Sequence, residues 1–267
     1  MKLGLKTKKS SIGACAPENA FSQIIGQSSE LLDQLKWPTN YAASEFPVRI
    51  DGETGTGKDL IAQGIYKSSR RADRPFVAFN CAGSTLELFE DKVFGHVPGA
   101  FTGAVSRRQG LVEMTDTGTL FLDEISALPH AAQSMLLRFL ETGDHRKVGE
   151  DAVRHANVRI ICATNKDLSR MVDSGTFFED LFYRLDALSL TLPPLRQRVE
   201  DIPLLAAHFI RHTVRTQLRR QPRFVQLPTA PQLTPWPVWL QVQNPYYLPA
   251  EQPVHVDNDE HCRNIHQ

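Results

Sequence analysis

The chain has 267 residues, 41% of them hydrophobic, which suffices for one buried core and a small second subdomain. Its thirty basic and thirty acidic residues leave a formal net charge of zero, so no global field draws it to nucleic acid or an anionic membrane. No apolar run approaches the ~20 residues that span a bilayer, and the lysine-rich N-terminus is followed by no apolar segment. The four cysteines are widely scattered, which fits a reducing compartment. We therefore expect a soluble, cytoplasmic protein that makes no membrane contact.

Short apolar runs alternate with longer amphipathic stretches from about residue 29 to residue 205. This alternation is typical of strands joined by crossover helices, so we expect an α/β fold with a parallel sheet. Five compact apolar runs predict five strands that are buried on both faces: 46–51, 75–80, 119–123, 158–163 and 187–192. The polar stretch 144–157, which carries a glycine, predicts a projecting hairpin before the fourth strand.

A glycine-rich segment lies between the first predicted strand and the predicted helix 59–69, which is the setting of a phosphate-binding P-loop. Its glycines allow backbone N–H groups to turn inward around phosphates, the helix N-terminus adds its positive dipole end, and the lysine reaches the β and γ phosphates of ATP. The alternative is a fortuitous glycine-rich turn. The candidate nucleotide-binding residues are Gly52, Glu53, Thr54, Gly55, Thr56, Gly57, Lys58 and Asp59.

Acidic residues complete the candidate site. The generic P-loop has Ser or Thr after the lysine as a ligand of Mg²⁺, and this chain has Asp59 there. The third predicted strand ends in Asp123 and Glu124, so Asp123 and Asp59 are the candidate Mg²⁺ residues and Glu124 is the candidate group that orients the attacking water. Alternatively, Asp123 and Glu124 are the acidic cap of a helix that begins near Pro129.

The fourth predicted strand is followed by Thr164 and Asn165. Their hydroxyl and amide groups could sense the γ phosphate at the edge of the sheet. Threonine and asparagine also cap helices, and the residues alone do not decide between these interpretations.

These motifs, together with Gly99, Ala100, Phe101, Thr102, Gly103 and Ala104, resemble the central AAA+ domain of sigma-54-dependent transcriptional activators. The resemblance extends over roughly residues 21–210. It implies a P-loop AAA+ three-layer sandwich that hydrolyses ATP, assembles as a homo-oligomeric ring, a hexamer in the family, and remodels sigma-54 RNA polymerase. An unrelated P-loop kinase or AAA+ enzyme is disfavoured, because those chemistries do not call for the segment 99–104.

The resemblance also implies individual roles. Residues 99–104 are similar to the loop that contacts sigma-54, through Phe101 and Thr102, although a glycine-flanked segment can also be an ordinary mobile loop. The hairpin 144–157 is similar to the family's second, supporting loop. Asn80 corresponds to the asparagine that hydrogen-bonds Glu124 and couples the nucleotide state to the loop.

The arginines that act on the neighbouring subunit's nucleotide are only partly present. Arg184 corresponds to one of the family's two arginines and is the candidate arginine finger, while Phe178 stands where the other belongs. Alternatively, Arg184 is an ordinary surface residue of a helix. Loss of an arginine finger costs about 10³ to 10⁵ in rate in comparable phosphoryl-transfer systems. The alternative to an active ATPase is therefore a catalytically impaired nucleotide-binding remnant of such an activator.

The resemblance divides the chain into an N-terminal extension (1–20), the AAA+ core (21–198), the start of a helical lid (199–216) and an irregular tail (217–267). The tail is rich in proline and glutamine, and it lacks the family's lid segment with its nucleotide-sensing arginine. A frameshift near residues 215–230 or a truncated gene is our hypothesis for this change, which resequencing of the locus tests. The sequence contains no recognisable DNA-binding helix-turn-helix, so we expect the protein either to reach DNA through a partner or to act from solution.

Overall fold

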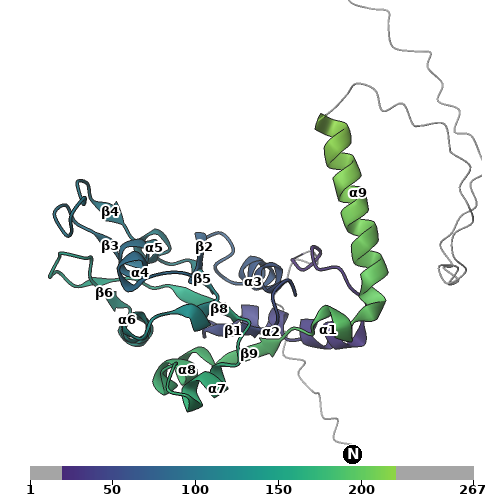
Figure 1. Cartoon of the computed structure of the whole chain (residues 1–267), viewed down its shortest axis with the longest axis horizontal. Coiled ribbons are helices and arrows are strands. Elements are labelled where there is room, and N and C mark those ends of the chain that lie inside the picture. The colour runs from purple at the N-terminus through teal and green to yellow at the C-terminus, as the bar shows by residue number, and fades with distance from the viewer. Residues whose placement is uncertain (1–19, 221–267) are drawn as a thin grey trace, which may run out of the picture. The chain divides into compact units, whose positions relative to one another are not determined.

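The computed structural model of the chain describes residues 20–220 (Figure 1). The predictions for the N-terminal extension and for residues 221–267 of the tail lie outside the described residues. None of the described helices is long and apolar enough to cross a membrane.

The core is a five-stranded parallel sheet with the strand order β2-β5-β8-β1-β9, which confirms the predicted α/β fold. Its central strand β8 is buried at every position, as expected for a strand covered on both faces. The first two strands begin one residue after a proline, because proline has no N–H to donate to the ladder. The strands are β1 (Val48–Asp51), β2 (Phe76–Asn80), β5 (Thr119–Asp123), β8 (Arg159–Thr164) and β9 (Leu188–Thr191).

Helices pack on both faces of this sheet and make three layers. Successive residues of a strand point to opposite faces, so Leu120 and Leu122 belong to one apolar cluster and Phe121 to the other. The first cluster is covered by α4 (Leu86–Val93), α6 (His130–Thr142), α7 (Leu168–Asp173) and α8 (Glu179–Leu185). The second is covered by α1 (Ser29–Leu35), α2 (Pro38–Ala42) and α3 (Lys58–Lys67). The expected three-layer sandwich is therefore present.

Two short antiparallel hairpins lie outside the main sheet. In the first, β3 (Gly95–His96) pairs with β4 (Arg108–Gln109), which is followed by α5 (Leu111–Met114). In the second, β6 (Asp144–His145) pairs with β7 (Arg154–His155), so the hairpin predicted for residues 144–157 is confirmed. We call the segments 97–107 and 146–153 the first loop and the second loop.

The chain leaves the sheet through two 3₁₀ turns, η2 (Leu195–Gln197) and η3 (Val199–Asp201), and enters α9 (Ile202–Arg220). This helix continues past residue 216, where the sequence suggested the start of the tail. Its entry is anchored because the buried Asp201 carboxylate accepts hydrogen bonds from the backbone N–H groups of Gln27 (2.6 Å) and Ser28 (2.9 Å).

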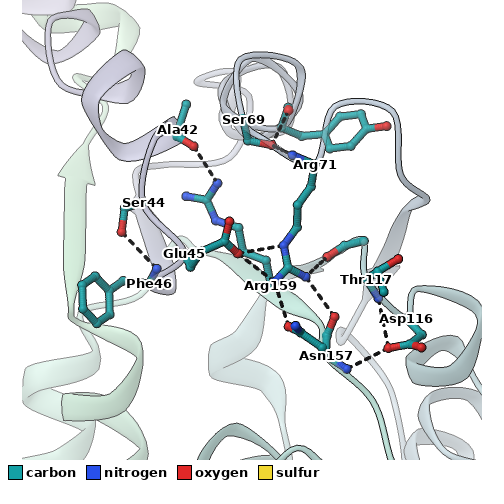
Figure 2. Close-up of polar contacts among 12 residues, drawn as sticks. Ala42, Ser44, Glu45, Phe46, Ser69, Arg71, Asp116, Thr117, Asn157 and Arg159 are labelled. Carbon is teal, nitrogen blue, oxygen red and sulfur yellow. Dashed lines mark hydrogen bonds and ion pairs between the residues drawn. The ribbon is translucent and has the colours of Figure 1, made fainter. Parts of the chain in front are cut away.

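The amino ends of the strands are held by two arginines (Figure 2). Arg71 donates to the carbonyl oxygens of Gly118 (2.8 Å) and Asn157 (2.9 Å), which precede β5 and β8. Arg159 is buried, and it donates to the carbonyl oxygens of Tyr41 (2.6 Å) and Ala42 (3.3 Å). The candidate site lies at the other end of the strands, so these arginines bear on stability.

Candidate nucleotide site and projecting loops

The strands that precede the candidate site are neighbours in the sheet. Parallel strands bring their carboxyl ends to one edge, and the order β2-β5-β8-β1 places the ends of these four strands side by side. Asn80 ends β2, Asp123 ends β5 and Thr164 ends β8, while the glycine-rich segment follows β1. Residues from four separate stretches of the sequence therefore meet at one edge.

The glycine-rich segment has the backbone of a phosphate-binding loop. Gly55 and Gly57 have φ values of +83° and +95°, which other residues rarely adopt, and α3 begins directly afterwards at Lys58. The Lys58 ammonium is nearly buried and donates to the carbonyl oxygens of Gly52 (2.8 Å) and Glu53 (3.0 Å). The loop thus surrounds a cation at the N-terminus of a helix, an arrangement that fits a polyphosphate.

The acidic pair lies at the end of β5. Glu124 adopts a left-handed conformation (φ +52°), and its N–H donates to Oδ1 of Asp123 at 3.0 Å. Such a strained backbone places the two carboxylates on a sharp turn. Helix α6 begins at His130 with Pro129 as its N-cap residue and without a side-chain cap, so the alternative that Asp123 and Glu124 cap this helix is not supported.

A metal ion would have few protein ligands here. Asp59 is exposed in the first turn of α3, and Asp123 is half-buried at the end of β5. Among residues 20–220 no three His, Cys, Asp or Glu side chains group as a metal cluster. Mg²⁺ usually needs only one or two carboxylates beside phosphate oxygens and water, so this donor set fits a nucleotide-bound Mg²⁺.

The expected hydrogen bond between Asn80 and Glu124 is not formed in this structure. Asn80 is aligned with Asp123 in the sheet register, yet its side-chain oxygen accepts from the N–H of Ala82 at 2.7 Å. This local bond uses the oxygen of the amide, as asparagine side chains often do within two residues. The amide nitrogen is the group that can donate to the Glu124 carboxylate, and no such bond is present in the conformation described.

Thr164 and Asn165 do not cap the helix that follows them. The cap of α7 is Asp167, whose carboxylate accepts from the N–H groups of Ser169 (3.1 Å) and Arg170 (3.3 Å). Asn165 instead lies 3.4 Å from the hydroxyl of Thr54, at the P-loop. The capping alternative is thus excluded for this helix.

Two arginines of the segment after β9 contact the P-loop, and the sequence analysis did not identify them as site residues. Arg196 pairs with the Glu53 carboxylate at 2.6 Å and lowers the pKa of that carboxyl group. Arg198 is buried and donates to the carbonyl oxygen of Thr56 at 3.2 Å. Their only signal in the sequence is a pair of basic residues in a short polar turn.

The first loop carries residues 99–104 on a tight turn. Gly99 and Gly103 have φ values of +83° and +98°, and the N–H of Gly99 donates to the carbonyl oxygen of Ala104 at 2.8 Å. Phe101 and Thr102 are exposed, with 47% of the phenylalanine accessible. The two glycines therefore present an aromatic side chain to solvent.

The second loop packs against the first. The N–H of Val97 donates to the carbonyl oxygen of Val148 (3.1 Å), and the N–H of Val148 donates to that of Gly95 (2.9 Å). Lys147 is buried and pairs with Glu113 of α5 at 2.8 Å. The two loops therefore form one backbone-bonded unit in this structure.

Arg184 is exposed near the end of α8, where it donates to the carbonyl oxygen of Leu140 at 3.1 Å. Phe178, at the start of the same helix, is half-buried and packs edge to face on His130 with ring centroids 4.9 Å apart. Its N–H donates to Oε1 of Gln133 at 2.9 Å. The place of an arginine is thus taken by a side chain that holds α8 against α6.

The sheet order, the P-loop at the end of β1 and the acidic turn at the end of β5 define a P-loop nucleotide-binding domain of the AAA+ class. The chain belongs to the family of sigma-54 interaction domains, whose family model matches residues 24–191. Both the resemblance inferred from the motifs and the predicted fold class are confirmed.

Named relatives agree with this assignment. The regulatory protein AtoC of Escherichia coli (strain K12) is 48% identical over 190 residues, which are 71% of this chain and 41% of AtoC. The anaerobic nitric oxide reductase transcription regulator NorR of Serratia proteamaculans (strain 568) is 45% identical over 84% of this chain and 44% of NorR. The crystal structure of NtrX from Brucella abortus in complex with ATP is 34% identical with a TM-score of 0.66, over 71% of this chain and 42% of that chain. The chain thus spans less than half the length of these relatives.

Proposed function

We propose that this chain is the ATP-hydrolysing module of a sigma-54-dependent transcriptional activator and that it remodels sigma-54 RNA polymerase. The observation that carries the proposal is that one domain has both a nucleotide site and a projecting loop. A lysine-centred P-loop lies at the carboxyl edge of the sheet, and an exposed Phe101 lies on a glycine-hinged loop of a separate hairpin. The family membership and the ATP complex of NtrX support nucleotide binding by this fold.

Each residue has a proposed role. Lys58 and the backbone of residues 52–57 bind the phosphates of ATP, and Asp123 with Asp59 holds Mg²⁺, which neutralises phosphate charge when bound. Glu124 orients the attacking water. Thr164 and Asn165 respond to the γ phosphate. This role is supported by the bond of the Thr164 carbonyl oxygen to the N–H of Gly52 (3.1 Å) and by the Asn165 amide, which lies 3.4 Å from the Thr54 hydroxyl.

The proposed assembly is a homo-oligomeric ring. Among the described residues, Arg184 of α8 makes no hydrogen bond or ion pair with the P-loop of its own chain. Arg184 is exposed and bonded only to a carbonyl of α6 among the described residues, so it is free to reach the nucleotide of a neighbouring copy. Such a contact stabilises charge in the transition state of phosphoryl transfer.

The second candidate function is a nucleotide-binding module with impaired hydrolysis. The observation that favours it is Phe178, which occupies an arginine position with a side chain that stabilises the contact of α8 with α6 and supplies no charge. This candidate predicts ATP binding with little turnover.

Steady-state ATP hydrolysis against protein concentration separates the two candidates. An active ring predicts a rate per subunit that rises with concentration and falls at least about a hundredfold in Arg184→Ala. Arg170→Ala is the matched control, since Arg170 is an exposed arginine on the adjacent helix α7 that pairs with Asp167. ATP binding without turnover at any concentration supports the impaired module. If the wild-type protein binds ATP no better than Lys58→Ala, both candidates are contradicted.

A further inference from the structure

His96 ties together the two arms of the first hairpin. It lies on β3, directly before the first loop, and only 8% of it is exposed. Its Nδ1 lies 2.5 Å from Oδ1 of Asp91 on α4, and its Nε2 lies 2.8 Å from the carbonyl oxygen of Ser106 on the returning arm of the loop. One imidazole thus connects the start of the loop, its end and the helix beneath it.

The same ring also contacts Phe101. The two ring centroids are 5.0 Å apart and the planes meet at 67°, an edge-to-face arrangement. Phe101 is 47% exposed, so part of its surface lies on His96 and the remainder faces solvent. The orientation of the one aromatic side chain at the tip of the loop therefore depends on the histidine below it.

Both polar partners of His96 are hydrogen-bond acceptors. A carbonyl oxygen can only accept, and Asp91 also accepts from Nη1 of Arg108 at 3.0 Å. Both ring nitrogens of His96 therefore face oxygen atoms that accept hydrogen bonds. Two further charged residues contact this hairpin: Lys147 donates to the carbonyl oxygen of Arg108 at 3.3 Å, and Glu113 pairs with that lysine.

We propose that His96 is a positioning residue that closes the first loop and orients Phe101 for contact with the protein partner. The inference rests on the proposed function only in the identity of that partner. The closure itself is a property of this chain: the charge-assisted bond to Asp91 fixes the ring, and the ring in turn holds Ser106 and Phe101.

The two ring hydrogen bonds are tested by NMR of the full chain labelled with ¹⁵N-histidine, the His96 signals being assigned with His96→Gln. We expect the ring-nitrogen signals of His96 to shift in Asp91→Asn, because this change replaces the partner of Nδ1. Ring-nitrogen signals that are the same in Asp91→Asn and in the wild-type protein overturn the proposal. This readout does not depend on ATP or on sigma-54.

Loop closure is tested by hydrogen exchange of the amides of Gly99 and Ala104, which bond within the loop. We expect exchange about tenfold faster in His96→Gln and in Asp91→Asn, because each loses a charge-assisted bond. His155→Gln is the matched control, since His155 also lies 3.0 Å from a carboxylate, that of Asp144, with its side chain 67% exposed on β7. Equal exchange in all variants overturns the proposal.

The functional consequence is tested by capture of purified sigma-54 in the presence of ATP. We expect His96→Gln to reduce capture at least about tenfold while ATP hydrolysis stays near the wild-type rate, because His96 lies outside the nucleotide site. Full capture by His96→Gln contradicts the orienting role. If the wild-type protein does not capture sigma-54, the proposed function fails, and the NMR and hydrogen-exchange experiments still decide the role of His96.

Discussion

Gly149 of the second loop lies directly against Ala100 of the first loop, so that a Cβ atom built on Gly149 would be 2.8 Å from the Cβ atom of Ala100. Gly149 also has a φ of +80°, in the region that favours glycine. The second loop can approach the first because this position has no side chain. The two loops therefore meet in a steric contact as well as through backbone hydrogen bonds.

Substitution of this glycine tests the contact. We expect Gly149→Ala to displace the first loop and to reduce capture of sigma-54 several-fold, with ATP hydrolysis retained. Gly175→Ala is the control, because Gly175 has a similar φ of +68° and no atom within 4 Å of a built Cβ. Both variants carry the backbone strain of roughly 1–2 kcal/mol, so only the difference between them reports the contact. Equal capture by the two variants would contradict the prediction.

Replacement of Phe178 tests whether the missing arginine limits hydrolysis. We expect Phe178→Arg to raise the rate of ATP hydrolysis per subunit about tenfold or more at a concentration where rings form. The same change removes packing on His130 and lowers the free energy of unfolding by about 1–2 kcal/mol. Phe178→Ala loses this packing without gaining a charge, so a rate increase in that variant as well would disprove the charge explanation.

The anchor of α9 predicts a pH-dependent stability. Burial by itself raises the pKa of Asp201. The pKa nevertheless lies below its ordinary value of 3.8, because the N–H groups of Gln27 and Ser28 donate to the carboxylate. A depressed folded-state pKa adds stability above the unfolded-state pKa, and this stability is lost as the pH falls through the folded-state value. We expect Asp201→Asn to cost about 1–3 kcal/mol at pH 7 and progressively less below about pH 4.

Urea unfolding of the wild-type protein and the variant at several pH values measures this difference. Asp33→Asn is the control, since Asp33 forms an exposed pair with Lys36 and contributes little. A difference in the free energy of unfolding between the wild type and Asp201→Asn that stays constant down to the most acidic pH would contradict the prediction.

The buried Arg159 predicts two unequal effects on stability. Burial lowers the pKa of this guanidinium to about 10, which reflects the cost of holding a charge away from water. Arg159→Met removes that cost but leaves the carbonyl oxygens of Tyr41 and Ala42 without a donor, so we expect a loss of about 1–3 kcal/mol. Arg159→Ala also opens a cavity and should cost at least about 1–2 kcal/mol more. Thermal or urea unfolding compares the stability of Arg159→Met with that of Arg159→Ala. Equal losses of unfolding free energy in the two variants would exclude a contribution from the cavity.

The sequence by itself determined the sheet and the P-loop. Strand 119–123 was predicted with its observed bounds, because a compact apolar run between turn residues has few other structures available. Gly55 and Gly57 were informative for a different local reason. Their positive φ values before a helix are a backbone requirement that few residues other than glycine meet.

The tertiary structure decided which polar groups meet. Arg196 reaches Glu53 across 143 residues and Arg198 reaches Thr56 across 142, and no local periodicity encodes such pairs. The side-chain oxygens of Asn80 and Asp167 accept from N–H groups two residues further along the chain, because such local donors are within reach whatever the motif suggests. Local patterns fix where the chain bends and which face is apolar, whereas side-chain hydrogen bonds depend on distances that exist only after the strands have been ordered in the sheet.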